Sequence, residues 1–163
     1  MNRKLIILIV VVVAVVAIVA IFAVLFLGAF SPPVDVYARP TPSISENPVD
    51  LLPGQVAGNA LLNVGENTFA NGIGALGSYE GGIEIQIERF SSSGAAASDL
   101  NAIIAFLESQ SGSMTSVNLG EQHWFTFNAD GASIFGWRKG AWVFVVFAPN
   151  EALRNQVAQE LPF

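Results

Sequence analysis

The side chains best suited to chemistry in this sequence are one histidine and a pair of glutamates, because cysteine is absent. A lone histidine can act as a general base or a haem ligand when a partner group lies beside it. His123 follows Gln122 and precedes Trp124, a context typical of the start of a β-strand. We therefore expect His123 to be a polar residue at a sheet edge or a hydrogen-bonded structural histidine. The missing cysteines exclude disulfides, thiolate metal sites and the attachment motif of c-type haem.

The two glutamates belong to the segment 83–90, in which isoleucines alternate with polar residues. This period of two predicts a strand with one buried and one polar face. Glu84 and Glu88 then lie on the same face, about 13 Å apart at ~3.3 Å per residue. Catalytic carboxylate pairs stand ~5–9.5 Å apart, so we interpret Glu84 and Glu88 as a solvated face.

Two further motifs have weak chemical meaning. The turn Arg138-Lys139-Gly140 could dock an acidic partner or lipid headgroups, although charged hairpin tips are common without such a role. The glycine-rich stretch 71–77 superficially resembles a dinucleotide-binding loop, but a strand follows it where a helix is required. We therefore predict no catalytic, cofactor-binding or metal-binding residues, and we do not expect an enzyme.

The elements that carry these residues predict an α+β fold, an antiparallel sheet of about five strands with two helices. The predicted order is β-β-α-β-β-β-α. The strands are expected at 78–80, 83–90, 122–129, 132–138 and 141–148, and the helices at 95–110 and from 149 onward. The turns are expected at Gly81-Gly82, Asp130-Gly131 and Lys139-Gly140, the second being a strong hairpin signal.

Several details of packing follow from the same patterns. The run 143–147 is apolar on both faces, which predicts an interior strand with Phe144 buried. The expected turn places Trp137 opposite Trp142 as a cross-strand pair. A stripe of apolar residues predicts the buried face of the first helix, comprising Leu100, Ile103, Ile104 and Leu107. The stretch 49–77 is weakly patterned, with Leu61, Leu62 and Val64 as expected core residues and 67–77 as an irregular loop.

Residues 5–30 form an uncharged apolar run that predicts a single transmembrane helix. At ~1.5 Å per residue it would reach ~39 Å, against a hydrocarbon core of ~30 Å. The competing interpretation is a cleaved signal peptide, but those have shorter apolar regions and a small-residue cleavage site that is poorly matched here. Arg3 and Lys4 precede the run, so residues 1–4 are expected to be a cytoplasmic tip, with the rest of the chain periplasmic or extracellular.

Beyond the span, the sequence predicts a proline-rich linker at 31–48 and an exported α+β domain at 49–163. Five prolines within the linker favour an extended spacer. After Arg3 and Lys4 are set aside, 13 acidic residues face five basic ones, a net charge of −8. Such an acidic domain would repel phosphate backbones, so nucleic acid is not an expected partner.

These features predict a non-catalytic, single-span accessory subunit of a larger membrane complex, of the kind that respiratory and photosynthetic electron-transfer complexes carry. Its partners would be other subunits and the lipid bilayer. Expected partner contacts are the small residues of the span and the apolar residues of the linker, namely Ala14, Ala17, Ala20, Ala23, Val34, Val36 and Tyr37. The alternative is a membrane-tethered ligand-binding or sensor module, with a pocket lined by Trp124, Trp137 or Trp142.

Overall fold

The computed structural model describes residues 31–69 and 71–163, and residues 32–163 form one compact unit. The predicted cytoplasmic tip, the predicted transmembrane helix and its four alanines lie outside the described residues. Among the helices that are described, none is long and apolar enough to cross a membrane.

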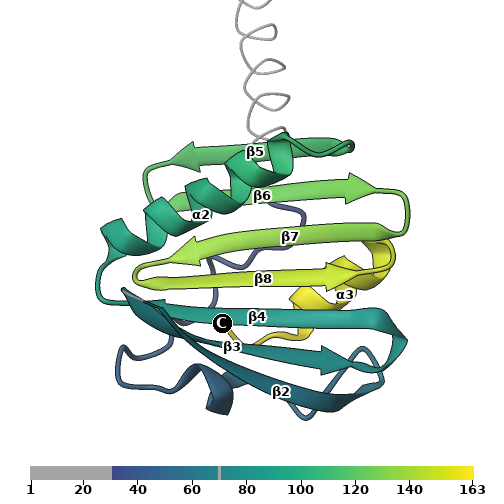
Figure 1. The fold of residues 1–163 in the computed structure, drawn as a ribbon, viewed down its shortest axis with the longest axis horizontal. Coiled ribbons are helices and arrows are strands. Elements are labelled where there is room, and N and C mark those ends of the chain that lie inside the picture. Colours follow the sequence, from purple (N-terminus) through teal and green to yellow (C-terminus); the bar gives the residue numbers. More distant parts are fainter. Residues whose placement is uncertain (1–30, 70) are drawn as a thin grey trace, which may run out of the picture. The chain divides into compact units, whose positions relative to one another are not determined.

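In the described part of the chain, eight antiparallel strands form one curled sheet in the order β1-β2-β3-β4-β8-β7-β6-β5 (Figure 1). The strands are β1 (Gln55–Val56), β2 (Asn59–Phe69), β3 (Gly72–Tyr79), β4 (Ile83–Phe90), β5 (Ser113–Leu119), β6 (Gln122–Ala129), β7 (Ala132–Lys139) and β8 (Trp142–Ala148). The helices are α2 (Ser93–Glu108) and α3 (Glu151–Glu160), with short 3-10 turns η1 (Pro48–Leu51) and η2 (Glu80–Gly82).

The predicted α+β class and its two helices are confirmed, but the prediction of about five strands is wrong. Strands β1, β2 and β5 were not expected, and the predicted loop 67–77 is a hairpin of β2 and β3. The reason is that these strands carry little alternation of apolar and polar residues. Leu62 and Val64, which were expected in the core, are instead exposed by 66% and 37%. Backbone pairing with β3, and not burial of side chains, therefore defines β2.

Turn chemistry accounts for the registers of the hairpins. Gly131 has φ +74° in the predicted Asp130-Gly131 turn, so that hairpin is confirmed. The β7–β8 turn falls one residue later than expected, at Gly140-Ala141, with Gly140 at φ +57°. Consequently the predicted Trp137–Trp142 pair is wrong. Trp137 lies opposite Phe144 instead, and the two rings stack with centroids 5.3 Å apart.

The two helices cover opposite faces of the sheet (Figure 1). Helix α2 packs on β4, β5, β6, β7 and β8, and its predicted stripe is confirmed by the burial of Leu100 and Leu107. The hydroxyl of Ser92 caps its first turn by accepting from the Ala95 amide. Helix α3 packs on β7 and β8, where Phe144 is fully buried in the interior strand, as predicted. The terminal Phe163 stacks on Phe144 at 4.7 Å.

Candidate functional site

The segment expected to be a free linker is packed on the domain. We name residues Val34–Pro40 the N-terminal strap. Within it, Val36 is fully buried, and the Tyr37 hydroxyl donates to the carbonyl of His123 at 2.9 Å and accepts from its amide at 2.8 Å. Arg39 Nη1 donates to the carbonyl of Ala158 at the end of α3 at 2.6 Å. The extended spacer predicted over 31–48 is therefore not observed in the strap.

Lys139 fastens the strap from the β7 side. Its ammonium group donates to the carbonyls of Val36 at 3.1 Å and Pro40 at 3.3 Å, and also to that of Arg39. Burial lowers the pKa of Lys139 and the nearby Arg39 charge lowers it further, whereas Asp35 acts in the opposite direction. The predicted basic docking turn thus has its lysine turned inward, because the strap's carbonyls replace water around the ammonium.

The predicted partner residues of the linker have unequal access to a partner. Val34 and Tyr37 are half-buried, whereas Val36 presents no surface in this arrangement. Contact between these residues and a partner stays a prediction. The three tryptophans proposed to line a ligand pocket are buried core residues, each at most 2% exposed, namely Trp124, Trp137 and Trp142.

His123 is fully buried, which differs from both sequence-based expectations. It is not at a sheet edge, because β5 pairs outside β6 and places Asn118 opposite it. Neither ring nitrogen has a hydrogen-bond partner among the described residues. Burial lowers the pKa of His123, and the charge of Arg138 lowers it further, so the ring is neutral near pH 7.

Glu88 is buried, so its assignment to a solvated face is wrong, whereas Glu84 on the same strand is exposed as expected. Glu88 lies between Gly74 of β3 and Val143 of β8, and it is only 7% exposed. One carboxyl oxygen, Oε1, accepts from Gln86 Nε2 at 2.8 Å. No N–H group among the described residues donates to Oε2, and the Asp99 carboxyl lies within hydrogen-bonding range of the Glu88 carboxyl. The sequence pattern could not show this burial, because it depends on the strands and helix beside β4.

The ionisation of Glu88 is strongly perturbed. Burial raises the pKa of Glu88 to about 7, since a carboxylate loses hydration there. The hydrogen bond from Gln86 opposes this shift, and the nearby carboxyl of Asp99 on α2 raises the pKa further. A carboxyl that is half ionised near neutral pH is a marker of functional sites, although structural networks also produce such groups.

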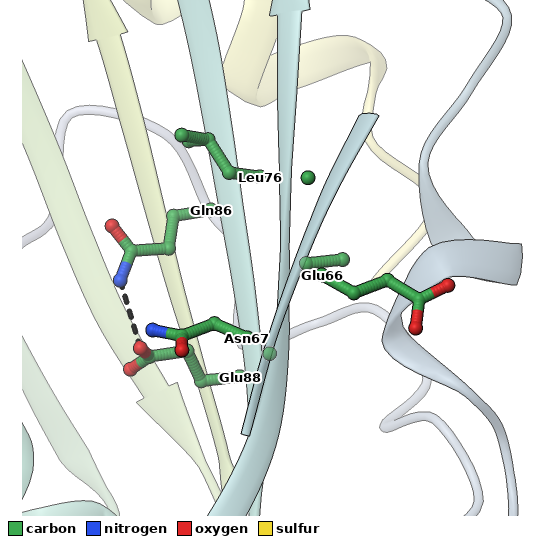
Figure 2. Close-up of a pocket in the computed structure, with 8 residues that line it drawn as sticks. Glu66, Asn67, Leu76, Gln86 and Glu88 are labelled. Carbon is green, nitrogen blue, oxygen red and sulfur yellow. Dashed lines mark hydrogen bonds between the residues drawn. The ribbon is translucent and has the colours of Figure 1, made fainter. Parts of the chain in front are cut away.

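Glu88 lines a depression of about 270 Å³ over β2, β3 and β4, which we call the Glu88 depression (Figure 2). Its lining consists of Gly65, Glu66, Asn67, Gly74, Ala75, Leu76, Gln86 and Glu88. Figure 2 shows Asn67, Gln86 and Glu88 on one side of the sheet, with Leu76 beside them, whereas the carboxylate of Glu66 points away. None of these residues was singled out from the sequence as a ligand-binding group.

The described residues contain no group of three or more histidine, aspartate or glutamate side chains placed to hold a metal ion.

Comparison with known proteins shows a similar fold but indicates no activity. No protein-family model and no curated protein matches the chain. A crystal structure described as a GTP binding regulator of Thermotoga maritima is similar over 72% of this chain and 87% of that one, with TM-score 0.50 and 16% identity. At this identity the likeness concerns the fold alone.

Proposed function

We propose that this chain is a non-catalytic, single-span accessory subunit of a larger membrane complex, with its N-terminus in the cytoplasm and its α+β domain outside. The observation that carries the proposal is the docked N-terminal strap. Five residues lie between the end of the predicted span at Phe30 and buried Val36, so six Cα–Cα steps reach at most ~22 Å. A domain fastened so soon after its anchor would be held at the membrane surface beside other subunits.

The charge of the domain indicates what kind of neighbour it has. Its net charge of −8 beyond the predicted span would be repelled by anionic lipid headgroups. The same charge favours a basic surface on a protein partner, through complementary potential. The span itself offers only packing, because it contains no polar group, and the four alanines provide the shallow ridge along which a neighbouring helix can approach.

Affinity purification from membranes in a mild detergent, followed by mass spectrometry, tests this function. We expect a stoichiometric membrane partner to co-purify with the full-length chain. Replacing Ala17 and Ala20 by leucine should weaken recovery of the partner, because larger side chains hold the helices apart. The matched control replaces Val15 and Val19 by leucine on the other side of the helix. Recovery of the protein without any stoichiometric partner would refute the proposal.

The orientation has its own test. A reporter enzyme fused after Phe163 should be active only outside the cytoplasm, since Arg3 and Lys4 are the positive charges that flank the predicted span on its N-terminal side. Activity of that reporter in the cytoplasm would contradict the proposed topology.

The Glu88 depression favours a second candidate function, a membrane-tethered ligand-binding module. Pockets with a few convergent polar groups and a perturbed carboxyl are the usual sites of small ligands. The Thermotoga protein is described as binding GTP, but we do not propose a nucleotide here. The lining of the depression contains no lysine or arginine, and Glu88 would repel a phosphate.

A further inference from the structure

We propose that the Glu88 depression binds a single cationic group, a guanidinium or a primary ammonium, carried on an apolar stem. This inference rests on the second candidate function and gives it a ligand class. It does not depend on the membrane complex, so the two ideas can fail separately.

The acceptor for the cation is the carboxyl of Glu88. The residue is only 7% exposed, no N–H group among the described residues donates to its Oε2, and the group that pairs with it is a second carboxyl, that of Asp99. A buried carboxylate beside a second carboxyl is costly, and a charged N–H donor is the partner that satisfies it best. The side-chain carbonyls of Asn67 and Gln86 lie on the same side of the sheet and offer further acceptors (Figure 2).

The remaining surface suits an apolar stem. Leu76 lies beside Gln86 and is 37% exposed, and Gly65 and Gly74 leave the neighbouring surface without side chains. The volume of about 270 Å³ is small for a drug-sized ligand, whose pockets measure ~300–1,000 Å³. It is suited to a ligand the size of an arginine or lysine side chain.

The charges around the depression also favour a cation. Asp99 of α2 faces Glu88, and Glu84 lies four residues away along β4 on the same face. From β3, the residue opposite Glu88 is the uncharged Gly74, and from β8 it is Val143. The basic residue on this face is Arg138 of β7, two strands or ~10 Å away, where it donates to the carbonyls of Gly140 and Gly120.

Binding of a cation should be coupled to the loss of the Glu88 proton. With its pKa at about 7, Glu88 is about one-tenth ionised at pH 6 and about nine-tenths ionised at pH 8. A ligand that binds only the carboxylate should therefore gain about 10-fold in affinity between these pH values. Conversely, a saturating ligand should lower the pKa of Glu88.

The test uses the full-length chain in a non-ionic detergent, with n-propylguanidinium as the probe and neutral n-propylurea as its isostere. Titration calorimetry at pH 6 and pH 8 measures the affinity, and carbon NMR of labelled glutamate carboxyls measures the pKa of Glu88. We expect the guanidinium to bind saturably, more tightly at pH 8, and to lower that pKa. Equal binding of the urea, or no saturable binding of the guanidinium, would overturn the proposal.

Two variants and one matched control localise the binding. Glu88→Gln keeps the shape, so it should reduce affinity at pH 8 about 10-fold and abolish the pH dependence. Glu84→Gln removes the same charge from an exposed position of the same strand and should change affinity less than about two-fold. Gly65→Val should block the depression without touching Glu88, because a Cβ there meets nothing closer than 3.9 Å. Unchanged binding in either Glu88→Gln or Gly65→Val would refute this site.

A last arm of the experiment separates a free metabolite from a side chain of a protein. A capped Gly-Arg-Gly peptide presents the same guanidinium on a chain. Tighter binding of this peptide than of n-propylguanidinium would identify a protein side chain as the ligand, and tighter binding of the small compound would identify a free amine or guanidine. Both results support the proposed cation site, whereas failure of both probes rejects it.

Discussion

Replacing Lys139 by methionine would release the N-terminal strap while keeping most of the apolar stem in place. The substitution removes the donors for the carbonyls of Val36, Arg39 and Pro40. A hydrogen-bonded charged group contributes ~1.5–3 kcal/mol, and an orphaned buried carbonyl costs ~1–3 kcal/mol. Part of this loss is offset because the ammonium no longer needs to be desolvated. We therefore expect Lys139→Met to lower the free energy of unfolding by about 2 kcal/mol.

The assay is urea unfolding of the full-length chain in detergent, followed by tryptophan fluorescence, together with hydrogen exchange of the strap amides. Arg138→Met is the matched control, because it removes the same charge one residue away from a side chain with longer hydrogen bonds of 3.2 and 3.5 Å. The control should change the free energy of unfolding by less than ~0.5 kcal/mol. Strap amides should exchange faster in Lys139→Met alone. If the two variants have equal stability and equal exchange, Lys139 does not hold the strap.

Four further predictions concern the core and its titrating groups. Phe144→Ala should destabilise by ~3–5 kcal/mol in urea unfolding, because the fully buried ring packs in the interior strand; a loss under ~1 kcal/mol would contradict its central position. Gly136→Ala should cost ~1–3 kcal/mol in the same assay, since a Cβ there would lie 2.3 Å from the Phe125 ring, and wild-type stability would show that the ring moves freely. The pKa of His123 is lowered in the folded state, so the unfolded chain takes up a proton on this histidine more readily. The free energy of unfolding should therefore decrease as the pH is lowered beyond about 6.5, and it should depend less on pH in that range in a variant without this histidine. The raised pKa of Glu88 acts in the opposite sense, because the wild type loses stability as the pH rises from ~4.5 to about 7. The free energy of unfolding of Glu88→Gln, relative to that of the wild type, should therefore be higher at pH 8 than at pH 5.

The parts of the fold that the sequence predicted are those in which one local pattern is sufficient. Alternation in β4, the apolar run of β8, the Asp130-Gly131 turn and the stripe of α2 each specify an element without help from distant residues. Strands β2 and β5 lacked such a pattern, because few of their side chains are buried and their neighbours define them by pairing. The predicted pairing of Trp137 with Trp142 was wrong because it depended on the position of the β7–β8 turn. That turn lies one residue later in the chain than the sequence suggested.

The candidate site was harder to predict because burial of polar groups is a tertiary property. Glu88 and Glu84 are equivalent in the sequence pattern, yet only Glu88 is covered. Lys139 resembled an exposed hairpin tip until the strap supplied carbonyls for its ammonium. The proline-rich composition of residues 31–48 did not indicate that Val36 would be buried against the domain or that Tyr37 would form hydrogen bonds with it.

The length of α2 explains why the depression lies where it does. Sixteen helical residues reach ~24 Å, enough to cross the five strands from β4 to β5, whose four spacings amount to ~19 Å. The face of β2 and β3 is left without a helix, so β4 marks the boundary of the cover. Glu88 lies on this boundary, where the helix side desolvates its carboxyl and its side chain lines the depression. Stability alone would favour an amide at position 88, which makes no demand for hydration of a charge. In its ionised form a carboxyl there attracts a cation more strongly than an amide would, and this difference connects its burial to the proposed binding.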